Sequence, residues 1–282
     1  MNIGIVGLGL MGGSLARTIV KNTKHSVFGT DISDKVMLKA SLLNCYHQVL
    51  TVENAKELDL LVVATRPEYF LDIVREYLPH LKSGAVVTDF CGIKRSVISD
   101  MKECEKVRPD LVYIGGHPMA GRELSGIEHS KTNLFDKASM ILVPLTQDLF
   151  ALEKVKAFYL SLGFLEVVIT DADNHDGMIA FTSQLCHIVS NAFIKNQTAE
   201  KHFGYSAGSY KDLTRVARLD ADMWAGLMTA NADKLLVELN EFIDNITEYR
   251  EALKNKDENK LRELLKDGND KKLSLDVKNS KG

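Results

Sequence analysis

The chain has 282 residues and a net charge of −3, with 45% hydrophobic and 26% charged residues. These values are typical of a soluble protein long enough for two domains, and they exclude a strongly charged nucleic-acid or membrane-surface binder. No apolar run approaches the roughly 20 residues of a membrane span, and a strand begins close to the N-terminus, so we expect no signal peptide. The four cysteines lack metal-site or disulfide spacing, which predicts reduced thiols in the cytoplasm.

Residues 3–31 predict a strand, a glycine-rich turn, a helix and a second strand that ends at an acid. The turn has the GxGxxG spacing of dinucleotide-binding proteins. Gly7 allows the tight turn, Gly9 lets the backbone approach a pyrophosphate, and Gly12 lets the helix pack closely on the strand. The helix then directs its free N–H groups and its positive dipole end at the phosphates.

Asp31 follows Gly12 by 19 residues and can accept hydrogen bonds from the ribose hydroxyl groups. A carboxylate at this position would repel a 2′-phosphate, which favours NAD over NADP. The alternative is a turn without a ligand, in which Asp31 is an ordinary helix N-cap. The predicted cofactor-binding residues are Gly7, Leu8, Gly9, Leu10, Met11, Gly12, Asp31 and Thr65.

Strand and helix patterns alternate as far as residue 169, which predicts a mostly parallel sheet with helices on both faces. The fold class is therefore a Rossmann-type, doubly wound α/β sheet. Beyond the first unit, strands are expected at 58–64, 85–89, 111–114, 139–143 and 165–169, and helices at 36–43, 68–81, 93–101 and 149–162.

From residue 171 onward the pattern is helical, without proline and almost without strand signal. Helices are expected at 172–194, 222–249 and 256–266, the last ending at Gly268 before a polar, frayed tail. We therefore predict an NAD-binding domain at 1–168 and an all-helical domain at 169–282. A helical domain in this position suits a dimer interface or a substrate cleft.

Three groups of residues are candidates for chemistry. His117 follows a strand at the edge where α/β sheets bind ligands, and it is either an acid–base group or a loop histidine bonded to backbone. His175, Gln184 and His187 lie in the apolar helix, where polar side chains need partners or a cavity. No ligand spacing completes a metal site, so no metal is expected.

The third group contains two arginines near the end of the segment 210–218. Arg215 or Arg218 could hold a substrate carboxylate through two parallel hydrogen bonds. The alternative is a surface ion pair with Asp212 or Asp220, which we favour for Arg218.

Together these segments resemble the prephenate/arogenate dehydrogenase family of tyrosine biosynthesis. The HPMAG and KDxTR segments are the specific matches, and the whole series runs in family order over about residues 1–250. Besides the glycine turn and Asp31, the matching segments are Thr88-Asp89 with Lys94, 117–126 (which includes Arg122 and Glu123), Leu134-Phe135, Val143-Pro144, His175-Asp176, 183–187, 211–215 and Met223-Trp224.

The resemblance implies roles for individual residues. By it, His117 contacts the 4-hydroxyl group of a cyclohexadiene substrate and helps to remove its proton, while Arg215 binds a substrate carboxylate and His187 contacts the substrate. It implies an oxidoreductase that converts prephenate with NAD to 4-hydroxyphenylpyruvate and carbon dioxide. It also implies a homodimer formed through the helical domain. Neither nucleic acid nor a membrane is an expected partner.

The chain departs from the family pattern at two predicted substrate-binding positions. Gly92 replaces a serine whose hydroxyl can assist at the substrate alcohol, so a water or a backbone N–H would have to replace it. Gln184 replaces a histidine and cannot carry a positive charge, which leaves the substrate side chain open.

Three alternatives therefore remain. Arogenate could replace prephenate, although His187 and the NAD-type acid favour the anionic pyruvyl group of prephenate. A β-hydroxyacid-type dehydrogenase would need a catalytic lysine, for which Lys211 is the candidate. A non-catalytic NAD-binding protein is the third alternative, favoured only by the loss of the serine at Gly92.

Overall fold

The structure, a computed structural model, describes residues 1–121 and 124–279 of the chain. Arg122 and Glu123, which belong to the family-like segment after His117, lie outside the described residues. The chain divides into two compact units, residues 1–232 and 233–282, which are described separately. The predicted division at 168/169 stays a prediction.

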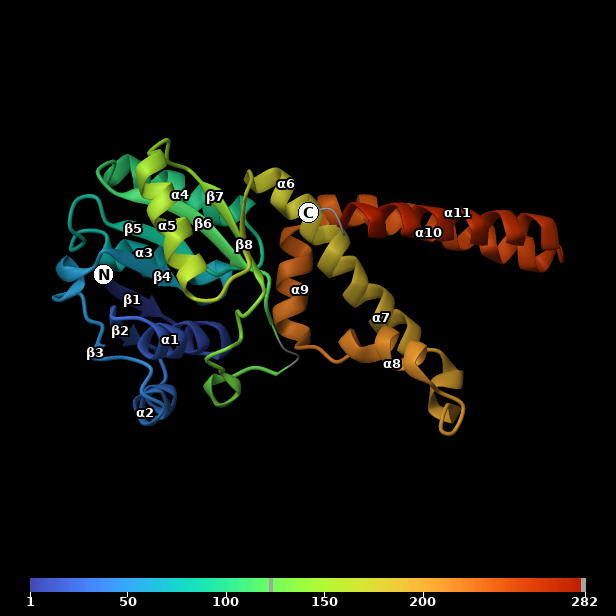
Figure 1. The fold of residues 1–282 in the computed structure, drawn as a ribbon, viewed down its shortest axis with the longest axis horizontal. Helices are drawn as coiled ribbons and strands as arrows, with labels where there is room; N and C mark the ends of the chain where they lie inside the picture. The colour runs from blue at the N-terminus through green and yellow to red at the C-terminus, as the bar shows by residue number, and fades with distance from the viewer. Residues whose placement is uncertain (122–123, 280–282) are drawn as a thin grey trace. The chain divides into compact units, whose positions relative to one another are not determined.

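An eight-stranded sheet forms the centre of the first unit, in the order β3-β2-β1-β4-β5-β6-β7-β8. All neighbouring strands are parallel except β6 and β7, which are antiparallel. This arrangement confirms the predicted fold class (Figure 1). The strands are β1 Asn2–Val6, β2 Ser26–Thr30, β3 Gln48–Val49, β4 Leu60–Val63, β5 Val86–Asp89, β6 Val112–Pro118, β7 Ser139–Pro144 and β8 Glu166–Ile169.

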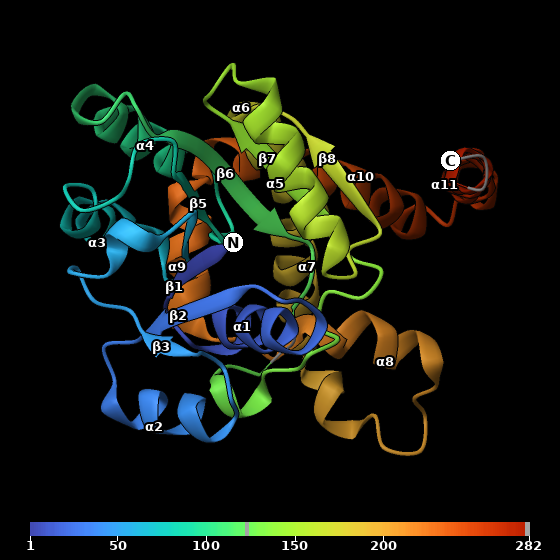
Figure 2. The same ribbon diagram turned by 60° about the vertical axis from the view of Figure 1, so that its left-hand side comes forward.

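Helices cover both faces of this sheet, as the alternation of strand and helix predicts. Ile3 and Ile5 point to the face that packs on α1, α2 and α5, whereas Leu61 and Val63 point to the face that packs on α3 and α4. Figure 2 shows α1 and α5 in front of the sheet and α3 and α4 at its left. These helices are α1 Leu10–Asn22, α2 Asp34–Leu42, α3 Phe70–Tyr77, α4 Arg95–Val107 and α5 Leu149–Ser161.

Sequence patterns placed most of these elements within a few residues, but α4 ends at Val107 rather than at the predicted residue 101, and two strands also differ. The two-residue strand β3 was not predicted, because it is too short to show any periodicity. Strand β6 is longer than predicted, since it continues through His117 and Pro118 and pairs with β7 there. His117 is therefore held in a strand rather than in the predicted loop.

A buried ion pair lies at the carboxyl end of β5, and its carboxylate also bonds the backbone of β6. Asp89 and Lys94 are both fully buried, and the Lys94 ammonium donates a hydrogen bond to the Asp89 carboxylate. The same carboxylate accepts the N–H groups of Cys91 at 2.8 Å and Gly116 at 2.9 Å. Because Gly116 precedes His117 in β6, this carboxylate fixes the strand that carries the candidate catalytic residue.

One long helical segment, Ala172–Ile194, begins the helical part. It consists of α6 Ala172–Ile179, a π-helical stretch Ala180–Leu185 and α7 Cys186–Ile194. Its length and mean hydropathy of 1.2 would also suit a membrane span, contrary to the expectation from sequence. It nevertheless carries buried polar side chains at His175, Asp176 and Gln184. Such groups are expensive in lipid and suit a helix that lines a site within a protein.

The predicted helix 222–249 is wrong, because the chain breaks at Asn231 between α9 and α10. The Asn231 side chain is fully buried and donates to the backbone oxygen of Asp176 and to the Gln184 amide oxygen, at 2.8 and 2.9 Å. These tertiary hydrogen bonds fix the break. The elements before α10 Ala232–Lys254 are α8 Gly208–Thr214, a short 3₁₀ turn Arg215–Ala217 and α9 Ala221–Ala230.

The second unit contains most of α10 and all of α11, Glu258–Asn279. The Tyr249 hydroxyl donates to the backbone oxygen of Leu264 at 3.2 Å and joins the two helices. The predicted stop at Gly268 and the frayed tail from 269 are wrong as far as Asn279, because α11 continues to that residue, and residues 280–282 lie outside the described residues. A single glycine costs a helix only about 1 kcal/mol, which does not end it.

The Asp89–Lys94 pair gives a first prediction. Asp89→Asn keeps the side-chain shape but leaves the Lys94 ammonium buried without its counter-ion, so we expect a loss of about 3–5 kcal/mol in the free energy of unfolding. Denaturant unfolding measures this loss. The control is Glu103→Gln in the exposed pair with Lys106, which should change the value by less than about 1 kcal/mol. Equal effects of the two substitutions would contradict the assigned role of Asp89.

Candidate active site

The glycine turn has the geometry that the sequence predicts. Gly7 has a φ of +90°, and a Cβ there would lie 2.8 Å from the Ala64 backbone oxygen. A Cβ on Gly12 would lie 1.9 Å from the Gly7 backbone oxygen. Both positions therefore exclude side chains, Gly7 for its conformation and Gly12 for the close approach of α1 to the turn.

Gly9 differs, because a Cβ built there has no atom within 4 Å. It is the N-cap residue of α1, it makes no side-chain capping bond, and the first turn of α1 contains no acidic residue. The open space and the positive helix end suit a pyrophosphate. Leu10 and Met11 begin this helix, and their apolar side chains are half-buried. Since apolar side chains cannot bond a phosphate, the contacts predicted for these two residues would be made by their backbone N–H groups.

Asp31 lies directly after β2 and is tied to the turn. Its carboxylate accepts the Leu8 N–H at 2.8 Å and the Ser33 N–H at 3.0 Å. Ser33, not Asp31, is the N-cap of α2, so the alternative role of Asp31 as a helix cap is wrong. The Leu8 side chain is fully buried and its N–H is used by Asp31, so its contribution is to hold that acid in place.

Thr65 follows β4, the strand next to β1 in the sheet. Its methyl carbon lies 2.9 Å from the position of a Cβ on Gly7, so it borders the glycine turn. The strand order reverses between β1 and β4, and open α/β sheets bind their ligands at such a point. The predicted cofactor-binding residues therefore lie together at the carboxyl edge, and their contact with NAD stays a prediction.

His117 is the first member of a hydrogen-bonded chain of three side chains. Its Nδ1 lies 2.9 Å from Nε2 of His175, and Nδ1 of His175 lies 2.7 Å from Oδ1 of Asp176. His117 comes from the end of β6, whereas His175 and Asp176 come from α6. The chain thus joins the sheet to the first helix of the helical part.

Asp176 is almost fully buried and accepts several further hydrogen bonds. Lys94 N–H donates to Oδ1 at 2.7 Å, and Arg95 donates to Oδ2 through its N–H at 2.9 Å and its Nε at 3.3 Å. Burial opposes ionisation of Asp176, but the hydrogen bonds from His175, Arg95 and Lys94 outweigh it and lower the pKa of the carboxyl. Asp176 is therefore a carboxylate at neutral pH.

Burial lowers the pKa of His117 well below the usual 6.5, and electrostatic interactions with His175 and with the Lys94 ammonium lower it further. The Asp176 carboxylate acts in the opposite direction and raises this pKa. The net effect leaves the His117 imidazole uncharged at neutral pH. An uncharged imidazole can accept a proton, as a general base must.

A second cluster surrounds His187 on α7. Its Nδ1 donates to the Val216 backbone oxygen at 3.0 Å, and its ring lies 3.8 Å from the Trp224 ring, centroid to centroid. Asn191 donates to the Ala217 backbone oxygen at 3.2 Å. The 3₁₀ turn that contains Arg215, whose side chain is exposed, is therefore bonded to α7 beside His187.

His187 and Arg215 thus lie close together, as a shared substrate contact requires. His187 follows His175 by 12 residues on one helical segment, about 18 Å along its axis at 1.5 Å a residue. Lys211, the candidate lysine of the β-hydroxyacid-type alternative, lies in α8, within the same KDLTR segment as Arg215.

Gln184 and Gly92, the two departures from the family pattern, both contact Leu227 of α9. The Gln184 amide is buried, donates to the Leu227 backbone oxygen at 3.1 Å and accepts from Asn231 at 2.9 Å. A Cβ on Gly92 would meet the Leu227 methyl groups at 3.7 Å. The structure thus gives Gln184 protein partners at both ends of its amide, and a substrate role for either residue stays a prediction.

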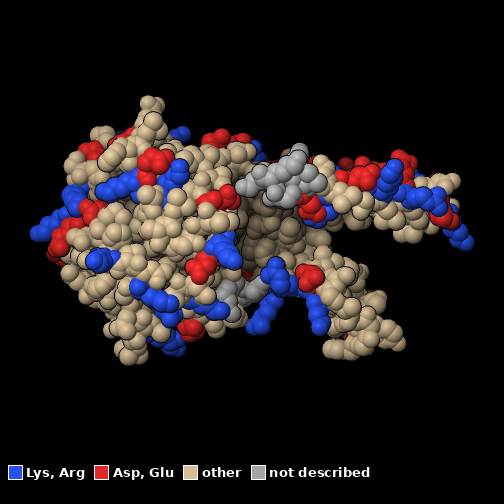
Figure 3. Space-filling view, in the orientation of Figure 1, with Lys and Arg blue, Asp and Glu red and all other residues tan. Residues whose placement is uncertain are grey.

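The surface is hollowed where the sheet faces α7 and α9, with Lys and Arg side chains below the hollow (Figure 3). Positive charge beside a cleft attracts anionic substrates. Among the described residues, no group of three His, Cys, Asp or Glu side chains could hold a metal ion. All four cysteines are free thiols.

Sequence reasoning missed the connection from His117 to His175 and Asp176. An adjacent histidine and aspartate at the start of an apolar helix was a usable signal, because such groups need buried partners. Arg95 and Asn231 were missed altogether. The Arg95 guanidinium donates to the Asn231 amide oxygen at 2.9 Å, a contact between residues 136 positions apart that no local pattern predicts.

The contrast between Gly9 and Gly12 gives a second prediction. Gly9→Ala places a methyl group in open space, so the protein should keep its melting temperature but lose about tenfold or more in NAD affinity, the equivalent of 1.4 kcal/mol. Gly12→Ala collides with the Gly7 backbone and should lower the melting temperature as well. Calorimetry and NAD titration measure both quantities. Undiminished NAD affinity in Gly9→Ala would contradict a pyrophosphate at this turn.

Comparisons with known proteins agree with this geometry. Residues 15–167 match the nucleotide-binding domain of prephenate dehydrogenase, and residues 171–267 match its dimerization domain. The prephenate dehydrogenase of Bacillus subtilis is 29% identical over 97% of this chain and 76% of its own length. The cyclohexadienyl dehydrogenase of Zymomonas mobilis is 28% identical over 97% of this chain and 96% of its own.

Solved structures agree as well. The prephenate dehydrogenase from A. aeolicus, in complex with hydroxyphenyl propionate and NAD⁺, has a TM-score of 0.85 at 27% identity, over 98% of both chains. The Synechocystis arogenate dehydrogenase has a TM-score of 0.81 at 24% identity, over 98% of this chain and all of the other, which shows a shared fold. Together with the two matched domains, these likenesses show that the chain belongs to the prephenate dehydrogenase family.

Proposed function

We propose that this protein is an NAD-dependent dehydrogenase that oxidises and decarboxylates prephenate to 4-hydroxyphenylpyruvate. The observation that carries the proposal is the uncharged His117, hydrogen-bonded to His175 at the same sheet edge as the glycine turn. Oxidation of an alcohol needs a base that accepts the hydroxyl proton and a bound dinucleotide that accepts the hydride. The B. subtilis and A. aeolicus relatives named as prephenate dehydrogenases support the choice of substrate.

The residues at the glycine turn fit NAD. When bound, NAD supplies the hydride acceptor for C4 of the substrate. Gly9 leaves space for the pyrophosphate, and the first turn of α1 has N–H groups without a side-chain cap. The Asp31 carboxylate, held by Leu8 and Ser33, suits a ribose with a free 2′-hydroxyl group.

His117 handles the substrate proton. It accepts the 4-hydroxyl proton as the hydride leaves C4, and the electrons of the broken C1–carboxylate bond then enter the ring to give a phenolate. His117 returns its proton to that oxygen, which completes the phenol. No net proton passes to solvent, so a half-buried base suits the cycle. General-base assistance of this kind is worth about 10²–10⁴-fold in rate.

Arg215 and His187 are the proposed anion-binding residues. Hydrogen bonds from His187 and Asn191 join α7 to the 3₁₀ turn that starts at Arg215. These bonds hold the backbone from which the Arg215 side chain extends. Arg215 can hold a carboxylate in bidentate fashion. Arogenate is the second candidate substrate, because the Z. mobilis relative is a cyclohexadienyl dehydrogenase and covers almost the whole chain.

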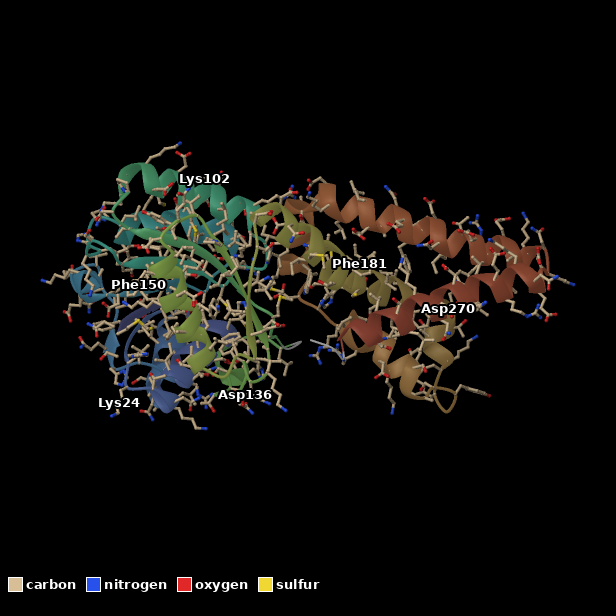
Figure 4. The ribbon with its side chains drawn as sticks, turned by 45° about the horizontal axis from the view of Figure 1, so that its top comes forward. Lys24, Lys102, Asp136, Phe150, Phe181 and Asp270 are labelled. Atoms are coloured by element: carbon tan, nitrogen blue, oxygen red, sulfur yellow. The ribbon has the colours of Figure 1, made fainter. Side chains whose placement is uncertain are left out.

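We further propose a cytoplasmic homodimer formed through the helical part. The match of residues 171–267 to a dimerization domain supports the dimer. Met178 and Phe181 on the helix 172–194 are more than half exposed, and Figure 4 labels Phe181 on this helix. Large exposed apolar side chains of this kind favour an interface. Four free cysteines fit a reducing compartment.

His117→Asn gives the third prediction. With prephenate and NAD, wild-type protein should produce NADH, whereas the variant should lose about 10²–10⁴-fold in kcat and keep its affinity for NAD. In the wild type, kcat/KM should rise with pH as His117 loses its proton, with an apparent pKa below 6.5, because burial lowers this pKa. Near wild-type turnover by the variant would remove His117 from this role. Parallel assays with arogenate and with NADP test the substrate and the cofactor.

Arg215→Ala gives the fourth prediction. Removal of a bidentate carboxylate contact should raise KM for prephenate by about tenfold or more, with a smaller change in kcat, because the contact is present before the reaction begins. Arg218→Ala, an exposed arginine three positions further on, is the matched control and should leave KM nearly unchanged. Equal KM values for the two variants would refute the carboxylate contact.

A further inference from the structure

The hydrogen-bond donors around Asp176 determine which group donates and which accepts in each hydrogen bond between Asp176, His175 and His117. Both Asp176 oxygens face backbone N–H groups, Oδ1 that of Lys94 and Oδ2 that of Arg95. A backbone N–H can only donate, so both oxygens must be acceptors. Because Asp176 is also ionised at neutral pH, it has no proton to donate and must accept from His175 as well, which places a hydrogen on Nδ1 of His175.

This hydrogen determines the remaining positions. With Nδ1 protonated, a His175 ring that carries no second proton has a bare Nε2, which can only accept. The contact of 2.9 Å with His117 then requires a hydrogen on Nδ1 of His117. In the uncharged His117 ring, Nε2 is therefore bare and available to a substrate proton. The tautomer of His117 is thus set by the Asp176 carboxylate, which lies two hydrogen bonds away.

We propose that His175 and Asp176 are positioning residues, which hold His117 in the one tautomer and orientation that can accept the substrate's hydroxyl proton. The inference deepens the proposed function and rests on it for the identity of the substrate. His175 is 1% exposed and His117 is half-buried, so water cannot readily replace His175 as the partner of Nδ1. A third group that orients a base in this way is known to be worth several orders of magnitude in other active sites.

The charges that face His117 support the same roles. Electrostatic interactions with His175 and with the Lys94 ammonium lower the pKa of His117, and the Asp176 carboxylate raises it. The Asp89 carboxylate is paired with Lys94 and accepts the N–H of Gly116, the residue before His117 in β6. Asp176 is thus the negative charge that lets His117 hold a proton briefly during turnover. Its removal should make His117 a weaker base.

The experiment compares three variants with the wild type. His175→Phe keeps the ring volume but removes the acceptor for His117, so kcat should fall by about 10- to 100-fold while NAD affinity is kept. His175→Gln offers an amide oxygen in place of Nε2 and should recover part of that loss. Asp176→Asn should lower kcat and move the acid limb of kcat/KM to lower pH, because the anion that raises the pKa of His117 is gone.

Asn174→Ala, at an exposed neighbour of His175, is the matched control and should behave as the wild type. Melting temperature and NAD titration identify variants that fail to fold. If His175→Phe does not fold, the acid limb of kcat/KM in Asp176→Asn decides between support and contradiction. Folded His175→Phe or Asp176→Asn protein with kcat within threefold of wild type and an unchanged acid limb would overturn the inference.

A separate measurement distinguishes failure of this inference from failure of the proposed function. If wild-type protein oxidises neither prephenate nor arogenate, the proposed substrates are wrong. The positioning role is then tested without substrate, by NMR titration of the His117 ring in wild type and in Asp176→Asn. A lower pKa of His117 in the variant supports the inference, and an unchanged pKa contradicts it.

Discussion

The buried Asp176 carboxylate is the constraint on which the site depends. It accepts the backbone N–H groups of Lys94 and Arg95 at the start of α4, so it fixes the first helix of the helical part against the sheet. It also accepts from His175, which contacts His117 at the end of β6. One side chain therefore joins the two parts of the first unit and orients the candidate base. An uncompensated charge at this depth would be costly, and these donors compensate it.

The two departures from the family pattern are neighbours in the structure. Gln184 bonds the backbone of Leu227, and the Leu227 side chain lies against Gly92. Gly92 and the uncharged Gln184 amide thus both lie beside Leu227 of α9. A Cβ at position 92 would lie beside Leu227, whereas Nδ1 of His117 has its partner in His175. The proposed positioning of His117 by His175 therefore needs no serine at 92.

Local physics made the sheet and the cofactor turn predictable from sequence. Gly7 and Gly12 are required by backbone conformation and close approach, and buried parallel strands leave continuous apolar runs. His117 was placed at the correct sheet edge for the same reason. The connection from His117 to Asp176 was not predictable in this way, since it joins residues 58 and more positions apart. The break at Asn231 likewise depends on tertiary hydrogen bonds, and Gly268 was too weak a signal to end α11.

We infer that His117 presents an unprotonated Nε2 to the substrate. Nitrogen-15 NMR of the histidine rings at neutral pH tests it most directly, because the two ring nitrogens differ strongly in chemical shift when only one is protonated. We predict that His117 and His175 both carry their hydrogen on Nδ1, with a bare Nε2. A His117 ring that carries its hydrogen on Nε2, or that is cationic at neutral pH, would contradict the account.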